Sequence, residues 1–278
     1  MKKFNVGLQL YSVRASMAED FEGTLRAVKE MGYDTVEFAG YYGRSGEQIK
    51  ALLDELGLRC VSVHQGLDFF NDEPEKKIEF LKTFGVKYSV IPWYKKEELA
   101  GSEKWEETAA LFRRTADLFA ENGIKLGYHN HDFEFDLHEG KYLYDYIFEA
   151  VDESKIEPEI DTCWVRYAGL MPDEQIRKFS GRVTLVHLKD FVCKKLASGP
   201  AYALIDENGN PMKPGTKQDN GFEFRPLGMG MQDFAAILKA CEECGTETVI
   251  VEQDQSYGMK DLEAARISRE YLKTTFGI

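Results

Sequence analysis

The chain has 278 residues, 43% of them hydrophobic and 30% charged, a composition typical of a soluble globular protein. Its formal net charge of −13 disfavours nucleic acid and anionic membrane surfaces as partners, because both attract basic proteins. No segment approaches the ~20 consecutive apolar residues that a membrane span requires, so we expect a cytoplasmic protein. The five cysteines do not form a disulfide framework, and the CxxC of Cys241 and Cys244 lies in a helical pattern, which favours a structural role.

Short apolar stretches at regular intervals are predicted to form eight strands. They cover residues 4–10, 35–38, 59–64, 88–91, 125–131, 156–161, 183–188 and 248–251. Segments with helical periodicity separate them, and several of these segments close with a glycine, as helix C-termini often do. The alternation of strand and helix predicts a parallel sheet with crossover helices.

Eight such units in a single domain over residues 1–278 predict a closed (β/α)8 TIM barrel. An open doubly wound sheet is the alternative, but the turn after the first strand, QLYSVRASMAED, lacks the glycines that such sheets use there. A long insertion over residues 190–230 follows the seventh strand and contains an Asn-Gly turn signal. We expect it to form a lid or substrate wall over the C-terminal face of the barrel, with a decorative insertion as the alternative.

Unusual polar residues gather at the C-terminal ends of the predicted strands, where the active sites of TIM barrels lie. They are Glu37, His64, His129, His131, Glu159, Asp161, His187, Lys189 and Glu252. Side chains two positions apart on a strand share a face, so the pairs on the fifth, sixth and seventh strands are each expected to point into the barrel mouth. A divalent cation would offset the repulsion among these carboxylates, and their oxygen and nitrogen ligands suit Mn, Mg, Co, Fe or Zn.

Each of these residues also has a structural interpretation. Asp161 precedes TCWV and would cap a short helix, and His187 would be a satisfied core histidine. Glu159 is expected to orient a neighbour rather than bind a metal, and Glu37 to play a supporting or structural role. The coincidence of all of them at strand ends favours a common site.

Five motifs in order, YHNHDFEF, EIDTCWVRYAG, VHLKD, GMGMQDF and VIVEQDQS, resemble those of the sugar phosphate isomerase/epimerase family among the xylose-isomerase-like barrels. The resemblance spans nearly the whole chain and implies a divalent metal, Mn first among the candidates, held by a Glu, Asp, His, Glu set. The last three ligands fall on Asp161, His187 and Glu252. The first falls on Glu134, with His129 as the alternative, because the fifth strand carries Tyr-His-Asn-His where many relatives have a glutamate.

YHNHDFEF is also similar to barrels that act on 3-keto sugars and glycosides, including the barrel subunits of C-glycoside deglycosidases. That resemblance implies a histidine base, for which we select His131, with Glu252 as a second catalytic group. The base would remove a proton α to the carbonyl of a sugar or keto sugar and form an enediolate. Return of the proton gives isomerisation or epimerisation, and loss of a β-substituent gives dehydration or glycoside cleavage; the sequence does not separate these outcomes.

Substrate-binding roles are predicted for His64, His129, Lys189 and Trp164, with Lys189 neutralising an oxyanion and Trp164 stacking on a sugar face. The family name does not by itself imply a phosphate on the substrate. A phosphate would require a glycine-rich helix N-terminus or an arginine clamp, and Gly228 and Gly230 before the seventh helix are the only candidates. A related DNA-repair endonuclease barrel is disfavoured by the small number of histidines and the acidic charge.

The non-enzyme alternative is a barrel that binds sugars or forms a complex without chemistry. A homo-oligomer or a complex with a partner subunit stays open.

Overall fold

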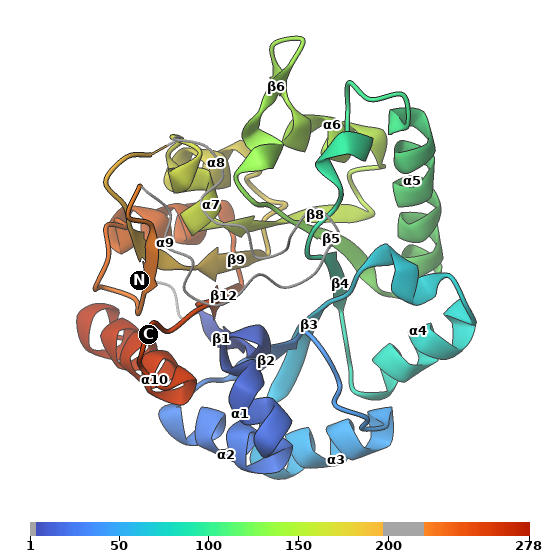
Figure 1. Ribbon diagram of the computed structural model, residues 1–278. Coiled ribbons are helices and arrows are strands. Elements are labelled where there is room, and N and C mark those ends of the chain that lie inside the picture. The colour runs from blue at the N-terminus through green and yellow to red at the C-terminus, as the bar shows by residue number, and fades with distance from the viewer. Residues whose placement is uncertain (1–3, 197–219) are drawn as a thin grey trace.

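Eight parallel strands form a closed barrel in a computed structural model that describes residues 4–196 and 220–278 (Figure 1). The order around the barrel is β1-β12-β9-β8-β5-β4-β3-β2. The strands are β1 (Asn5–Gln9), β2 (Thr35–Phe38), β3 (Arg59–His64), β4 (Tyr88–Ile91), β5 (Lys125–His129), β8 (Ile156–Asp161), β9 (Leu185–Leu188) and β12 (Thr248–Val251). The predicted TIM barrel and all eight predicted strands are confirmed.

Helices surround the barrel and connect consecutive strands. They are α1 (Arg14–Glu19), α2 (Phe21–Met31), α3 (Gly46–Leu56), α4 (Pro74–Thr83), α5 (Trp105–Glu121), α6 (Leu143–Ala150), α7 (Thr162–Tyr167), α8 (Pro172–Lys178), α9 (Phe234–Cys244) and α10 (Asp261–Tyr271). Gly32 and Gly57 end α2 and α3 in the left-handed conformation, at φ of 94° and 62°, which a side chain would disfavour. Cys241 and Cys244 are buried in the core face of α9, in agreement with their predicted structural role.

Shorter elements complete the described chain. The single-turn helices are η1 (Leu10–Val13), η2 (Leu67–Phe70), η3 (Lys96–Glu98), η4 (Phe133–Phe135) and η5 (Leu272–Phe276). Two small antiparallel ladders join β6 (Leu137–His138) to β7 (Lys141–Tyr142) and β10 (Asp190–Val192) to β11 (Glu223–Arg225).

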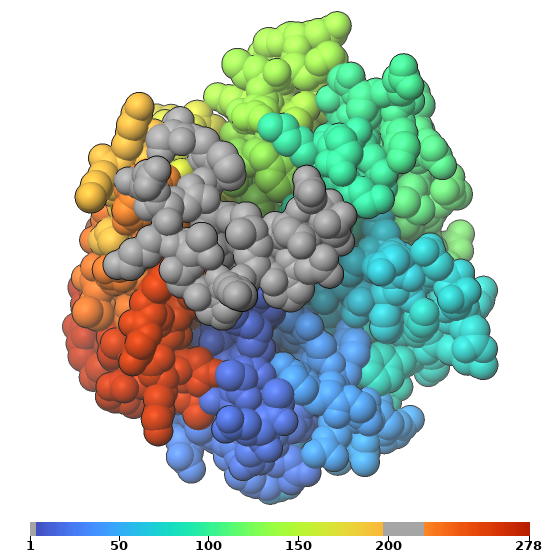
Figure 2. All heavy atoms as spheres, viewed as in Figure 1, coloured from blue at the N-terminus to red at the C-terminus, as the bar shows by residue number. Residues whose placement is uncertain are grey.

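The ends of the chain meet on one side of the barrel. Strand β1 pairs with β12, and α10 packs against α2. Figure 2 shows the surface of the C-terminal segment lying beside that of the N-terminal segment. In the part of the chain that the structure describes, no helix is both long and apolar enough to cross a membrane.

The predicted insertion leaves the barrel through β10 and returns through β11. Its first residues are therefore paired with residues 223–225, near its predicted end, through Asp190↔Arg225 and Val192↔Glu223. The Asn-Gly turn signal and most of the expected lid fall within residues 197–219, outside the described residues, so the lid stays a prediction.

The interior of the barrel is divided between an apolar base and a polar mouth. Val90, Leu185 and Ile250 pack together as a small cluster, and His187 and Glu252 follow Leu185 and Ile250 two positions later on the same faces. Gly127 of β5 lies beside Val90 of β4, so close that an added Cβ would lie 2.6 Å from Val90 Cγ2. The absence of a side chain at Gly127 thus lets β4 and β5 approach beneath the mouth.

Gly127→Ala should lower the free energy of unfolding by about 1–3 kcal/mol, because the extra methyl group overpacks the barrel interior. Urea denaturation followed by circular dichroism measures this change. Gly40→Ala is the matched control, since its Cβ would meet nothing within 4 Å, and it should change stability by no more than about 0.5 kcal/mol. Equal stabilities of the two variants would contradict the tight contact at Gly127.

Candidate metal centre and active site

His187 lies at the centre of the barrel mouth, fully buried between acids from three strands. Its Nδ1 is 2.9 Å from Oε2 of Glu252, and its Nε2 is 2.8 Å from Oε1 of Glu37. Glu37 is itself fixed, because Gln9 donates from Nε2 to its Oε1 at 2.6 Å and Ser62 donates a hydrogen bond to its Oε2. Glu37 therefore orients the His187 imidazole from the side opposite to Glu252, which agrees with the supporting role considered for it.

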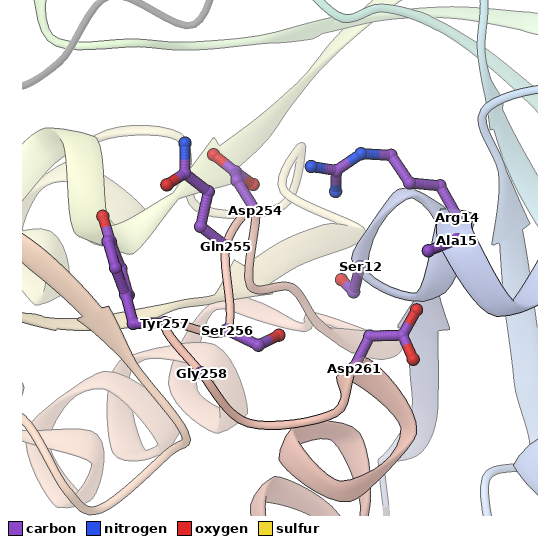
Figure 3. Close-up of a pocket in the computed structure, with 9 residues that line it drawn as sticks. All are labelled: Ser12, Arg14, Ala15, Asp254, Gln255, Ser256, Tyr257, Gly258 and Asp261. Atoms are coloured by element: carbon purple, nitrogen blue, oxygen red, sulfur yellow. The ribbon is translucent and has the colours of Figure 1, made fainter. Parts of the chain in front are cut away.

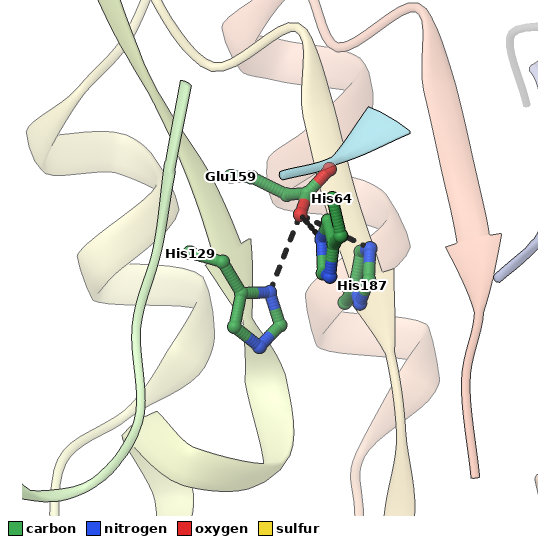
Figure 4. A group of neighbouring side chains, drawn as sticks. All are labelled: His64, His129, Glu159 and His187. Carbon is green, nitrogen blue, oxygen red and sulfur yellow. Dashed lines mark hydrogen bonds and ion pairs between the residues drawn. The ribbon is translucent and has the colours of Figure 1, made fainter. Parts of the chain in front are cut away.

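Glu159 joins three histidines through one oxygen. Its Oε2 lies 2.6 Å from Nε2 of His64, 3.3 Å from Nδ1 of His129 and 3.2 Å from Nε2 of His187 (Figure 4). Burial acts to raise the pKa of Glu159, but the neighbouring His187 and His64 hold it well below its usual range. Glu159 thus contacts all three imidazoles and brings His64 into the same network, and its role of orienting a neighbour rather than binding a metal stays a prediction.

The two oxygens of Asp161 have different partners. Oδ1 accepts a hydrogen bond from the backbone N–H of Trp164 at 3.0 Å and caps α7, as the structural interpretation anticipated. Oδ2 turns into the mouth, 3.7 Å from Nε2 of His129 and 3.2 Å from Nζ of Lys189. Burial raises the pKa of Asp161 to about 6 and lowers that of His129 to about 3. The cap therefore fixes the carboxylate while leaving one oxygen for the site.

Lys189 is 1% exposed and contacts three carboxylates. Its Nζ lies 2.9 Å from Oε2 of Glu252, 3.0 Å from Oδ1 of Asp254 and 3.2 Å from Oδ2 of Asp161. The ammonium also lies 5.1 Å from the ring centroid of Trp164, within the range of a cation–π contact. Its charge offsets the buried acids, and a role toward a substrate oxyanion stays a prediction.

Two overlapping groups of side chains have the composition of a metal site. One comprises His64, His129, Glu159 and His187, and the other comprises His129, Asp161, His187 and Glu252, with ligand atoms within 4.8 Å of one another in each. The second group fits a cation better. There, His129 and His187 turn one nitrogen toward Asp161 and Glu252 while Glu159 and Glu37 contact the other nitrogen, the arrangement in which metal-binding imidazoles are commonly oriented.

Glu134, the predicted first ligand, belongs to neither of these groups. It follows β5 in the η4 turn, where its Oε1 accepts a hydrogen bond from the Tyr128 hydroxyl and its Oε2 accepts one from the backbone N–H of His131, each at 2.8 Å. Burial raises the pKa of Glu134 to about 8. The structure instead brings the alternative ligand, His129, into the donor group.

His131 lies just beyond β5, beside the donor group. Its ring centroid is 5.4 Å from that of His129, and the ring stacks on Trp164 at 5.4 Å and on Phe133 at 6.0 Å. Its buried Nδ1 has no hydrogen-bond partner among the described residues. Its backbone N–H donates a hydrogen bond to Glu134. Burial lowers the pKa of His131 well below its usual range. The side chain is thus a neutral imidazole, held between two rings, with one nitrogen that has no hydrogen-bond partner among the described residues.

The glycine-rich turn before α9 does not offer its amides to a phosphate. The N–H groups of Gly228 and Gly230 both donate to Oδ2 of Asp190 at 2.9 Å, and that of Gln232 donates to Oδ1 at 3.2 Å. The anion-binding geometry foreseen for Gly228 and Gly230 is real, but a carboxylate of the chain itself fills it. The turn therefore anchors the returning end of the insertion.

Sequence reasoning missed the polar groups that support the site. Gln9 and Ser62 orient Glu37, Asn130 holds the backbone of Asp161 through two hydrogen bonds, and Asp254 pairs with Lys189. A signal was present for Gln9 and Asp254, because Gln9 ends β1 and Asp254 follows Glu252 by two positions. No sequence pattern predicts a role for Ser62 or Asn130, because their roles depend on neighbours that are distant in the sequence.

Comparison with known proteins identifies the family of this chain. Residues 25–275 match the model of the xylose isomerase-like TIM barrel family. The chain belongs to this family. The predicted family is therefore confirmed.

Curated relatives of this family member are enzymes. The chain is 26% identical over 189 residues to the inosose dehydratase of Geobacillus kaustophilus, a match that spans 60% of each chain. It is 24% identical over 276 residues to the inosose dehydratase of Clostridium perfringens, with 91% of this chain and 89% of the relative covered. The prediction of an enzyme from a sugar-modifying family is thereby confirmed.

Solved structures share the fold at lower identity. A sugar phosphate isomerase/epimerase from Parabacteroides distasonis superposes with a TM-score of 0.74 at 21% identity, covering 98% of both chains. The IolI protein, solved with a bound zinc atom, superposes with a TM-score of 0.64 at 17% identity, covering 97% of this chain and 96% of its own.

Glu134→Gln should keep the bound cation at about one per chain, because Glu134 lies outside both donor groups. The same change should not lower the free energy of unfolding at pH 7, because burial raises the pKa of Glu134 to about 8 and the neutral amide is close in shape to the protonated acid. Elemental analysis and urea denaturation measure the two effects, with the exposed Glu139→Gln as the control. Loss of the cation at unchanged stability would instead identify Glu134 as a ligand.

Proposed function

We propose that the protein is a divalent-cation-dependent dehydratase of keto sugars or keto polyols. The observation that carries this proposal is the position of His131, a half-buried imidazole with an unpartnered nitrogen beside a donor group of two imidazoles and two carboxylates. A base next to a cation site suits removal of a proton α to a carbonyl. The inosose dehydratases among the relatives support elimination as the outcome.

The residues that would hold the cation are His129, Asp161, His187 and Glu252. When bound, a divalent cation supplies a Lewis acid that polarises a carbonyl and a neighbouring hydroxyl of the substrate. Mixed imidazole and carboxylate ligands accept Mn as well as Zn or Fe. Mn stays our prediction, and the zinc atom in the IolI structure supports a divalent cation in a barrel of this fold without identifying the ion.

The reaction then depends on what the side chains of the chain do. His131 Nδ1 takes the proton from the carbon next to the carbonyl, and the C–H electron pair moves toward the carbonyl oxygen to give an enediolate. The electrons return as the β-carbon loses its hydroxyl, which takes the proton held by His131 and leaves as water. Lys189 keeps Asp161 and Glu252 close together despite their like charges, and the stacked rings of Trp164 and Phe133 keep His131 in place.

Isomerisation or epimerisation is the second candidate, and it shares the first step. The fold similarity to the Parabacteroides distasonis isomerase/epimerase supports this second candidate reaction. In this case the proton taken by His131 returns to a carbon instead of leaving with the hydroxyl. The two reactions give different products. Only elimination releases water, and only elimination gives an unsaturated ketone, which absorbs ultraviolet light.

Glu252→Gln should bind less than a tenth of the cation that the wild type binds, because it removes a charged ligand from the donor group. Elemental analysis of protein incubated with Mn and then desalted measures the occupancy. The exposed Glu121→Gln is the control and should retain the cation. A wild type without a bound cation would refute the cation-dependent mechanism.

His131→Gln should slow exchange of the substrate α-proton with solvent deuterium by about 10²–10⁴-fold while the cation stays bound, because it removes the base and not a ligand. Nuclear magnetic resonance follows the exchange on a panel of inososes and ketohexoses, and ultraviolet absorbance follows elimination. His138→Gln is the matched control, since His138 lies in β6, outside both donor groups. Wild-type exchange in the His131 variant would exclude His131 as the base.

A further inference from the structure

A pocket of about 360 Å³ lies between the segments that follow β1 and β12, with Ser12 on one side and Tyr257 on the other (Figure 3). Among the described residues, buried Lys189 and Asp254 fill the space between this pocket and the barrel mouth, with Nζ and Oδ1 3.0 Å apart. A ligand in the pocket would therefore not reach the reacting atoms. The side chains that control the proposed reaction lie around the mouth itself.

Asn130 lies where β5 leaves the barrel, between the proposed ligand His129 and the proposed base His131. The backbone pairing of β5 with β8 ends at His129↔Glu159. Beyond this pair, Asn130 Oδ1 accepts a hydrogen bond from the N–H of Asp161 at 3.0 Å, and its Nδ2 donates to the backbone oxygen of Asp161 at 3.2 Å. A side-chain amide can make both bonds because it carries an acceptor oxygen and two donor hydrogens. The side chain of Asn130 thus extends the pairing of the two strands.

The same amide also contacts the backbone of the proposed base. Asn130 Nδ2 lies 3.5 Å from the backbone oxygen of His131, a long contact for a hydrogen bond. The N–H of His131 donates to Oε2 of Glu134 at 2.8 Å. The backbone of His131 is therefore held from two sides, by Asn130 and by Glu134.

These contacts close a ring that passes through both the base and a proposed ligand. The N–H of Trp164 donates to Oδ1 of Asp161 at 3.0 Å. The Trp164 ring stacks on the ring of His131, with centroids 5.4 Å apart and planes 29° apart. His131 follows Asn130 in the chain, and the Asn130 side chain returns to the backbone of Asp161. A displacement of Asn130 would therefore change the distance between the His131 ring and the Asp161 carboxylate.

Asn130 can affect the reaction only through its neighbours. Its side chain is 0% exposed, so it does not line the mouth, and it belongs to neither group of candidate cation ligands. Its amide is neutral and supplies no charge to the buried acids. Positioning alone can still be decisive, because a shift of about 1 Å in a reacting group can slow a reaction about 10²-fold.

We propose that Asn130 is a positioning residue for the reaction, which sets the distance and orientation of His131 relative to Asp161. The inference rests on the proposed function, because it takes the roles of base and ligand from it. It gives a neutral, buried amide control over the rate of proton removal, although this amide contacts neither the substrate nor the cation.

Proton exchange tests the effect on the rate. Asn130→Ala should lower the rate constant of α-proton exchange at saturating substrate by about 10–100-fold, measured by nuclear magnetic resonance on the inosose or ketohexose that the wild type exchanges fastest. KM should change by no more than about threefold and the cation should stay bound, because no ligand or substrate contact is removed. Asn122→Ala is the matched control and should exchange like the wild type. The amide of Asn122 donates to the backbone oxygen of Leu118 at 2.9 Å, at the end of α5 and before β5 begins.

The position of the base can also be measured without turnover. In protein labelled with ¹⁵N at histidine and loaded with Co²⁺, the paramagnetic ion shifts each ring resonance according to its distance and direction from the ion. The Zn²⁺-loaded protein gives the reference, and His131→Gln assigns the signals of His131. Asn130→Ala should change the paramagnetic shifts of the His131 ring and leave those of His138, in β6, as in the wild type. Asn122→Ala should change neither.

Other results would overturn the positioning role. Exchange within about twofold of the wild type in Asn130→Ala, unchanged paramagnetic shifts of His131, or equal losses in Asn122→Ala would each exclude it. Loss of the cation from Asn130→Ala would show that Asn130 supports the ligands rather than the base. If Asn130→Ala does not fold, Asn130→Asp replaces it, because a carboxylate keeps the acceptor for the N–H of Asp161 and loses the donor. Failure of both variants to fold would make Asn130 an anchor of the barrel instead.

The wild type separates this inference from the proposed function. A wild type that binds no cation or exchanges no α-proton would refute the proposed function, and the positioning role with it. A wild type that does both, with Asn130 variants that match it, would refute the positioning role alone.

Discussion

The structure depends on the way positive groups offset a set of carboxylates buried in the barrel mouth. Glu37, Glu159, Asp161, Glu252 and Asp254 are at most 5% exposed, and removing such charges from water costs several kcal/mol each unless they are paired. Lys189 contacts three of these acids, and His187 contacts three as well, sharing Glu252 with the lysine. The acids still outnumber the lysine, which is the electrostatic condition that a divalent cation satisfies.

The architecture was predictable because its signals are local. Each strand is a short apolar run, and the polar residues at its end lie where the parallel strands of a barrel converge. Side chains alternate between the two faces of a strand, so His187 and Glu252 point to the same side as Leu185 and Ile250. The sequence therefore predicts the barrel, its polar mouth and most of the residues in that mouth.

The orientation of individual side chains was harder to predict from the sequence. Glu134 lies only a few residues beyond the fifth strand, yet the η4 turn directs it to Tyr128 and to the backbone of His131. The acid that fills the glycine-rich turn, Asp190, comes 40 residues before Gly230, so no local pattern could associate them. Such choices depend on contacts between segments that are distant in sequence.

The paired ends of the insertion have an evolutionary consequence. Strands β10 and β11 close on each other, and Asp190 anchors the returning turn, so the chain between them joins the barrel at one fixed pair of points. The entropy of closing a loop grows only slowly with its length, so residues added or lost there would cost the barrel little stability. Family members could therefore exchange this one segment without rebuilding the strands of the barrel.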